Sequence, residues 1–127
     1  MLAKHDGFVN MTTYQDPHLC IHFHRQTVLL DGAPLTLTRK EYELLALLSQ
    51  NAGEIVPRPE LLMRIWGYGE GIRTRTLDVH IRRLRRKLAP FTEQYIETIF
   101  GVGYRFQPYR VRGSYQVQPA LAMPAIA

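Results

Sequence analysis

One stretch near the middle of the chain, RTRTLDVHIRRLRRKL at residues 73–88, constrains the fold more than any other. On a helical wheel its apolar side chains fall within about 60° of one another, and they are Leu77, Ile81, Leu84 and Leu88. A stripe this narrow predicts a helix that is anchored to a core along one side. The opposite side carries Arg75, Val79, Arg82, Arg83 and Arg86.

The charge on this predicted helix is concentrated and almost entirely positive. A solvated surface helix usually mixes charges of both signs at i,i+4 spacing, whereas here Asp78 is the only acidic residue. A guanidinium can bind guanine O6 and N7 or a phosphate through two hydrogen bonds, and Val79 suits a thymine methyl group. The pattern therefore favours a polyanion as partner, and an ordinary solvated helix face is the competing interpretation.

Composition narrows the class of protein. The chain has 127 residues, enough for one compact domain, and its net charge of +5 favours nucleic acid, an acidic membrane surface or an acidic protein as partner. Its single cysteine, Cys20, excludes an internal disulfide and fits a reducing compartment. No signal-like or membrane-spanning apolar run is visible. We expect a soluble cytoplasmic protein with no membrane partner.

The N-terminal part of the chain predicts a small antiparallel sheet. Residues 1–14 show no clear period and are expected to be a flexible N-terminal segment. From Leu19 to His24 apolar and polar side chains alternate, which is the period of a half-buried strand. A second strand at residues 27–30 meets the turn pair Asp31-Gly32, and residues 34–37 return.

Three helices and a hairpin are predicted after the sheet. Thr38 and Glu41 form a capping box that begins a helix ending near Gly53. A shorter helix spans about residues 58–66, without a side-chain acceptor to cap its start, so its first turn is expected to fray. The basic helix follows and stops at Pro90. Residues 95–106 then predict a hairpin, and residues 108–127 predict a disordered tail.

In this order the elements resemble the OmpR/PhoB-type winged-helix DNA-binding domain of bacterial response regulators. The resemblance covers about residues 15–106 and rests on LTLTRKEYELLALLSQNAGEIV, LLMRIWGY, RTRTLDVHIRRLRRKL and IETIFGVGYRF. It implies an α+β winged helix-turn-helix domain at residues 15–107, with a four-stranded N-terminal sheet, a three-helix core and a C-terminal β-hairpin wing. It further implies a bacterial transcriptional regulator that binds double-stranded DNA without cofactor or catalysis. Helix 74–88 would enter the major groove, and wing 95–106 the minor groove.

The resemblance also implies roles for individual residues. Three match base contacts: Asp78, Val79 and Arg83. The residues that match contacts to the DNA backbone are Trp66, Arg75, Thr76, His80, Arg82, Arg85, Arg86, Thr98 and Tyr104. For Trp66, a role as core filler is the competing interpretation. Loop 67–72 matches a segment that touches RNA polymerase in activators of this family, and a plain turn is the alternative.

Departures from the family pattern sharpen these expectations. Phe100, beside Gly101 at the wing tip, stands where many members place an arginine, and we expect it to pack on sugar edges or fold back. The Gly101-Val102-Gly103 turn is expected to let the backbone approach phosphates. No receiver domain precedes the DNA-binding region, so we expect an effector domain separated from its receiver or an orphan regulator. The resemblance and the short chain predict a monomer that forms a tandem dimer on direct repeats.

Two other functions compete with DNA binding. One is a winged-helix protein-interaction module whose basic face binds an acidic protein. The other is a metal site formed by His18, Cys20, His22 and His24. Alternate residues of a strand lie about 6.5 to 7 Å apart, so these four side chains cannot all reach one ion without a bend, and we predict no tight metal binding.

Overall fold

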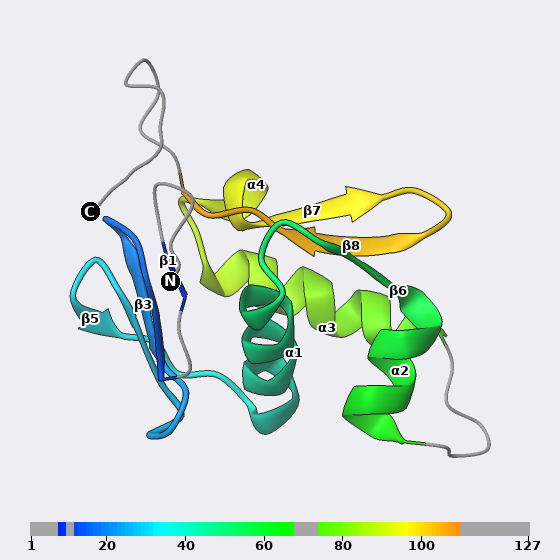
Figure 1. Ribbon diagram of the computed structural model, residues 1–127, viewed down its shortest axis with the longest axis horizontal. Coiled ribbons are helices and arrows are strands. Elements are labelled where there is room, and N and C mark those ends of the chain that lie inside the picture. The colour runs from blue at the N-terminus through cyan, green and yellow to red at the C-terminus, as the bar shows by residue number, and fades with distance from the viewer. Residues whose placement is uncertain (1–7, 10–11, 68–73, 110–127) are drawn as a thin grey trace. The chain divides into compact units, whose positions relative to one another are not determined.

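The protein is described by a computed structural model that covers residues 8–9, 12–67 and 74–109 (Figure 1). It divides into two compact units, one made of residues 1–36 and 108–127 and the other of residues 37–107. Most of the predicted tail, residues 110–127, lies outside the described residues. The same holds for residues 68–72 of the predicted polymerase-contacting loop.

The first unit contains the predicted antiparallel sheet. Its strands are β1 (Phe8–Val9), β2 (Thr13–Gln15), β3 (Leu19–His22), β4 (Thr27–Leu30) and β5 (Ala33–Pro34), in the spatial order β1-β2-β3-β4-β5. Tyr14, Ile21 and Val28 face one another across neighbouring strands, and all three are buried. The predicted turn is confirmed, because Asp31 and Gly32 both have positive φ, at 51° and 81°.

This unit differs from expectation at both ends. The described residues form five strands instead of four, because Phe8–Val9 pairs with β2. The prediction that the flexible N-terminal segment extends to residue 14 is wrong, because Tyr14 lies in β2 and has no exposed surface. Tyr109 is also held in place, because its backbone N–H donates to Asp16 Oδ2 at 3.2 Å. Strands of two or three residues carry too short a pattern to be recognised in sequence.

The second unit begins with helix α1 (Arg39–Gln50), and its predicted capping box is present. The Thr38 hydroxyl accepts from the Glu41 backbone N–H at 3.2 Å, and the Glu41 carboxylate accepts from the Thr38 N–H at 2.9 Å. Glu41 is only 1% exposed, and Lys87 reaches it from another helix, with Nζ 2.7 Å from Oε1. Glu41 therefore caps α1 and also forms an ion pair with Lys87 of α3.

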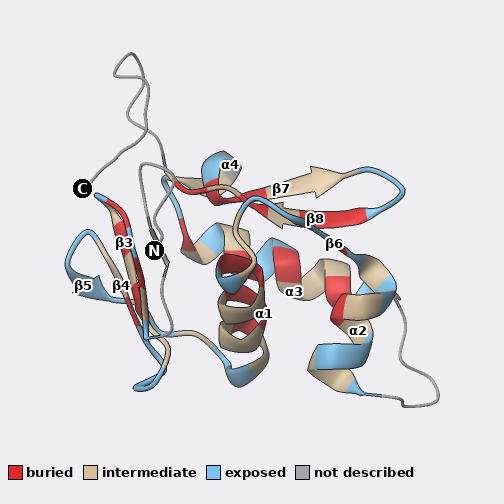
Figure 2. Ribbon diagram, in the orientation of Figure 1, coloured by how far each residue is buried: buried red, intermediate tan, exposed pale blue. Residues whose placement is uncertain are grey.

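Helices α2 (Arg58–Trp66) and α3 (Thr74–Lys87) complete the three-helix core. The predicted apolar stripe of α3 is confirmed, because Leu77, Ile81, Leu84 and Leu88 are all buried. Leu44, Leu45 and Leu48 of α1 and Leu61 of α2 are fully buried as well. Figure 2 shows these buried segments in red along α1 and α3. One face of the basic helix is therefore fixed to the core.

The wing belongs to a three-stranded sheet that the sequence predicts only in part. Strands β7 (Ile96–Ile99) and β8 (Gly103–Phe106) form the expected hairpin, and β6 (Ile55–Pro57) pairs with β8 on its other side. A one-turn helix, α4 (Thr92–Tyr95), comes before the hairpin and takes in Tyr95, the first residue of its predicted range. Gly103 faces the fold, because a Cβ there would lie 2.1 Å from the Val56 carbonyl oxygen. This glycine permits close packing of β8 on β6.

Candidate nucleic-acid interface

The exposed side of α3 presents four guanidinium groups around one apolar side chain. Arg75, Arg82, Arg83 and Arg86 are exposed, and Val79 is half-buried among them. We call these five residues the arginine face. None of the four guanidinium groups forms a hydrogen bond or ion pair with another described residue. Because no described residue holds these guanidinium groups by a hydrogen bond or ion pair, they are available to an external polyanion.

The only acidic residue of α3, Asp78, is bound within the protein. Arg58, the first residue of α2, donates to both of its carboxylate oxygens at 2.7 Å, and the Tyr104 hydroxyl donates to Oδ1 at 2.6 Å. These hydrogen bonds, led by the one from Arg58, hold the pKa of Asp78 below its usual value against the opposing effect of burial. The family-implied role of Asp78 in reading a base is therefore joined by a structural role.

Three residues that are expected to contact the DNA backbone also have partners inside the domain. Arg85 donates to the Ile96 carbonyl oxygen at 2.8 Å and to Thr98 Oγ1 at 2.6 Å. Tyr104 is only 4% exposed, and its hydroxyl is bound to Asp78. Burial and the hydrogen bond to Asp78 raise the pKa of Tyr104. Arg85, Thr98 and Tyr104 thus hold the wing on α3, and their contacts with the DNA backbone stay a prediction.

Trp66, the last residue of α2, meets His80 in the middle of α3. Their rings meet edge to face with centroids 5.1 Å apart, and Lys40 Nζ lies 5.8 Å from the Trp66 ring centroid. His80 Nδ1 lies 2.8 Å from the Thr76 carbonyl oxygen. Trp66 is half-buried, so part of its surface stays accessible beside the arginine face. These residues can support a backbone contact without being dedicated to it.

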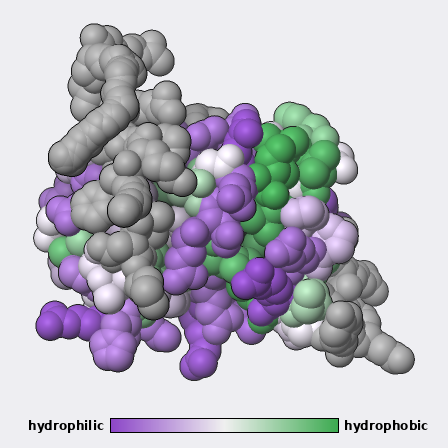
Figure 3. All heavy atoms as spheres, in the orientation of Figure 1, coloured by the Kyte–Doolittle hydropathy of each residue, from purple (hydrophilic) through white to green (hydrophobic). Residues whose placement is uncertain are grey.

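The wing tip is apolar and projects into solvent. Phe100 is 89% exposed, Val102 is 44% exposed, and Gly101 adopts a positive φ of 78° in the turn. Figure 3 shows apolar surface, in green, gathered over this end of the molecule. The expectation that Phe100 folds back on the domain is wrong, and packing on an external surface is the alternative that stays open.

Sequence reasoning missed Arg58, which binds Asp78 beside the arginine face. A cation at the first turn of a helix is unfavourable because the backbone N–H groups there carry partial positive charge. Arg58 stands between two prolines at that position, where no side chain caps the helix. A cation in such a place implies a nearby acidic partner, so the signal was present although the partner could not be identified from sequence. The Asp78 hydrogen bonds raise the pKa of Arg58, which stays charged.

The histidine and cysteine side chains of the first unit are not gathered around one point. His18 Nδ1 lies 2.6 Å from Asp31 Oδ1, whereas Cys20 Sγ lies 3.5 Å from His22 Nε2. Burial, and to a lesser extent the charge of Asp16, raises the pKa of the Cys20 thiol, which disfavours the thiolate that binds metals. Among the described residues no three potential ligands converge on a metal position.

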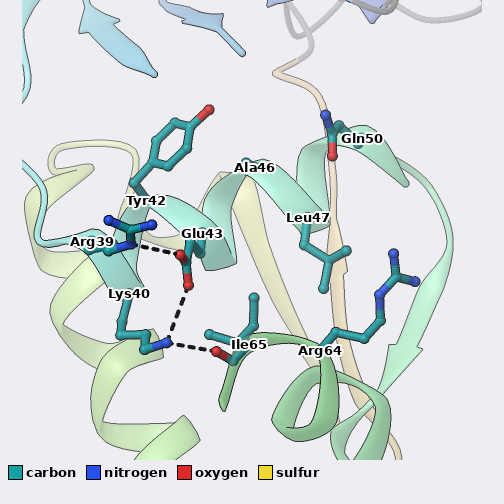
Figure 4. Close-up of a pocket in the computed structure, with 9 residues that line it drawn as sticks. All are labelled: Arg39, Lys40, Tyr42, Glu43, Ala46, Leu47, Gln50, Arg64 and Ile65. Carbon is teal, nitrogen blue, oxygen red and sulfur yellow. Dashed lines mark hydrogen bonds and ion pairs between the residues drawn. The ribbon is translucent and has the colours of Figure 1, made fainter. Parts of the chain in front are cut away.

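A shallow pocket of about 470 Å³ lies between α1 and α2 (Figure 4). Its charged groups bind one another and the backbone, since Lys40 Nζ is 3.4 Å from Glu43 Oε1 and donates to the Ile65 carbonyl oxygen at 2.7 Å. Arg39 also binds Glu43, at 3.2 Å. The Lys40 hydrogen bond to Ile65 thus joins the last turn of α2 to α1. No helix in the described part of the chain has the length and apolar character needed to cross a membrane.

Comparison with protein families and curated proteins agrees with this geometry. Residues 32–106 match the family model described as "Transcriptional regulatory protein, C terminal". The chain is 51% identical over 81 residues to transcriptional regulatory protein HprR of Escherichia coli, covering 63% of this chain and 36% of HprR. It is 46% identical over 78 residues to response regulator ArlR of Staphylococcus saprophyticus, covering 61% of this chain and 36% of ArlR. The chain thus spans little more than a third of these relatives' length.

Solved structures share the fold. The DNA-binding domain of Klebsiella pneumoniae RstA, solved in complex with the RstA box, is 34% identical with a TM-score of 0.68, covering 76% of this chain and 98% of that domain. DrrB of Thermotoga maritima, an OmpR/PhoB homologue, is 35% identical with a TM-score of 0.69, covering 75% of this chain and 44% of DrrB.

Proposed function

The chain belongs to the OmpR/PhoB-type family of C-terminal DNA-binding domains of transcriptional regulatory proteins, and from this we propose that it binds specific sites in double-stranded DNA. In this proposal α3 enters the major groove and the β7–β8 wing lies at the neighbouring minor groove. The observation that carries the proposal is the arginine face, whose four guanidinium groups form no hydrogen bond or ion pair with a described residue. The phosphates of a DNA duplex can neutralise the positive charge of such a helix.

The arginine face divides into base readers and phosphate contacts. Arg83 lies on the exposed side of α3 and is proposed to bind guanine through two hydrogen bonds, with Val79 against a thymine methyl group. Arg75, Arg82 and Arg86 are proposed to bind phosphates on the two sides of the groove. Trp66, Thr76 and His80 flank the same surface and are proposed to support those contacts.

The wider role rests on the relatives. Because HprR and ArlR are regulators of which this chain matches only a part, we propose that the chain acts as the output domain of a two-component response regulator in the cytoplasm. Two subunits are proposed to occupy direct repeats as a tandem dimer. Contact with RNA polymerase through loop 67–72 is a further proposal that rests on the family resemblance alone.

The experiment that tests this function selects binding sites from random duplex DNA and then measures affinity at several salt concentrations. Arg83→Ala is expected to cost about 1–3 kcal/mol and to relax preference at one base pair, because it removes a base contact. Arg82→Ala is expected to weaken binding to all sequences alike, because it removes a phosphate contact. The slope of log affinity against log salt concentration should become less steep by about one.

Arg39→Ala is the matched control, because it removes an equal charge from an exposed position on α1. It is expected to leave site preference unchanged. If Arg83→Ala and Arg39→Ala lose affinity equally, α3 does not enter the groove. If the chain selects no duplex but binds an acidic protein in a salt-dependent manner, it is a protein-interaction module instead.

A further inference from the structure

Polar contacts hold the wing against α3 at two separate points. The first is the Asp78 cluster, made of Arg58, Asp78 and Tyr104, which joins the start of α2, the middle of α3 and strand β8. The second is Arg85, which binds the Ile96 carbonyl oxygen and Thr98 Oγ1 on β7. All the residues involved lie within the same compact unit.

The spacing of these two points restricts how the wing can move. Asp78 and Arg85 are seven residues apart on α3, which is two helical turns and about 10 Å along the axis. A single contact would let the hairpin pivot, whereas two contacts this far apart fix its direction relative to the helix. The Tyr104 ring adds to this arrangement, since the guanidinium carbons of Arg58 and Arg85 lie 6.0 and 5.7 Å from its centroid.

The Asp78 cluster also reaches the wing turn through the backbone. The Arg58 N–H donates to the Val102 carbonyl oxygen at 2.9 Å, so the first residue of α2 binds the wing by its main chain and Asp78 by its side chain. The Asp78 side chain is 41% exposed, but both of its oxygens already accept hydrogen bonds from these partners. A base that used this carboxylate would have to compete with a charged, two-point interaction.

We propose that Asp78 is a positioning residue, which together with Arg58, Tyr104 and Arg85 fixes the wing relative to α3 so that both enter DNA as one rigid unit. This inference rests on the proposed DNA-binding function. It assigns base reading to Arg83 and Val79 and gives Asp78 a different task. The Asp78 cluster then sets the distance between α3 and the wing that meets the minor groove. A variant with a loosened wing keeps its base preference in the major groove but loses contact with the minor groove beside the site.

The test compares Asp78→Asn, Tyr104→Phe and Arg58→Met with the unchanged chain. Tyr104→Phe is the sharpest variant, because it removes one hydroxyl from a residue that is too buried to touch a base. Glu43→Gln is the matched control, because it removes the charge that pairs with Arg39 and Lys40 on α1 and holds no wing contact. Site selection measures base preference, and hydroxyl-radical footprinting on the selected duplex measures wing contact. Thermal melting shows that each variant is folded.

All three variants are expected to lose protection of the flanking minor groove and about tenfold in affinity, with unchanged preference at the central base pairs. Glu43→Gln is expected to behave like the unchanged chain. The inference is overturned if Asp78→Asn changes preference at one central base pair while Tyr104→Phe leaves the flank protected, since Asp78 would then read a base. It is also overturned if all variants bind as the unchanged chain does. If the unchanged chain itself selects no duplex, the proposed function has failed, and the inference fails with it.

Discussion

Replacing Lys87 by methionine should destabilise the domain, because it leaves the buried carboxylate of Glu41 without its cationic partner. The Glu41 side chain is only 2% exposed, and its Oε1 accepts from Lys87 Nζ at 2.7 Å and from the Thr38 N–H at 2.9 Å. Methionine keeps the length of the side chain but removes the cation. Glu41 would then hold a negative charge away from water, with only the capping-box hydrogen bonds left to stabilise it.

The size of the effect follows from the exposure of the two partners. Removing one member of a fully buried ion pair costs about 3–5 kcal/mol. The Lys87 side chain is 36% exposed, so solvent already screens part of the pair. Glu41 also keeps its hydrogen bonds at Thr38. We therefore expect a loss of about 2 kcal/mol in the free energy of unfolding at neutral pH, or about 6 to 10 °C in Tm.

The loss should depend on pH in a definite direction. Burial raises the pKa of Glu41, but the hydrogen bonds from Lys87 and Thr38 outweigh it and hold the pKa below its usual value. A lowered pKa contributes stability above the unfolded value, about 4.3, and loses it as the pH falls through the folded value. In the Lys87→Met variant the burial of Glu41 is expected to dominate and to raise the pKa of Glu41. The folded variant then takes up a proton at Glu41 more readily. The difference in unfolding free energy between the unchanged chain and the Lys87→Met variant should therefore become smaller below about pH 5.

Urea denaturation followed by circular dichroism between pH 4 and 8 would measure this difference. Arg39→Met is the matched control, because it breaks an exposed ion pair on the same helix and should cost less than about 0.5 kcal/mol. The double variant Glu41→Gln/Lys87→Met should recover part of the stability at neutral pH, since it leaves no buried charge. A loss for Lys87→Met that is as small as that of Arg39→Met, or one that stays constant with pH, would refute the reasoning.

Three further predictions concern the core, the wing and the assembly. Leu84→Ala should cost about 2–5 kcal/mol in unfolding free energy, because it removes a fully buried side chain from the α3 stripe; a loss below 1 kcal/mol in urea denaturation would contradict that packing. Phe100→Arg should sharpen preference for A·T pairs beside the site and steepen the salt slope by about one, while unfolding stays unchanged because Phe100 is 89% exposed; unaltered site selection would place the wing tip away from DNA. The chain should sediment as a monomer and select direct repeats about 10 to 11 base pairs apart, and a stable dimer in solution or inverted repeats would argue against tandem binding.

Much of the helical architecture could be predicted because its determinants are local. The capping box joins Thr38 to Glu41, three residues away, and the buried stripe of α3 repeats every three or four residues. The turn at Asp31-Gly32 likewise needs only its own two residues to adopt positive φ. The arginine face follows from the same period, because burying one side of the helix leaves the other exposed. Short elements such as β6 and α4 escaped prediction, since three or four residues carry no readable period.

Tertiary structure alone decided which charged residues stay available for a ligand. Sequence by itself determined that α3 has one apolar side and one basic side, but Arg85 and Arg83 carry the same side chain and differ only in their surroundings. Arg85 finds acceptors on β7, whereas Arg83 finds none among the described residues. The partners of Asp78 and Glu41 lie 20 to 46 positions away in the chain. A hydrogen bond depends on atoms that meet within about 3 Å, and only packing of the helices and the wing brings such distant residues together.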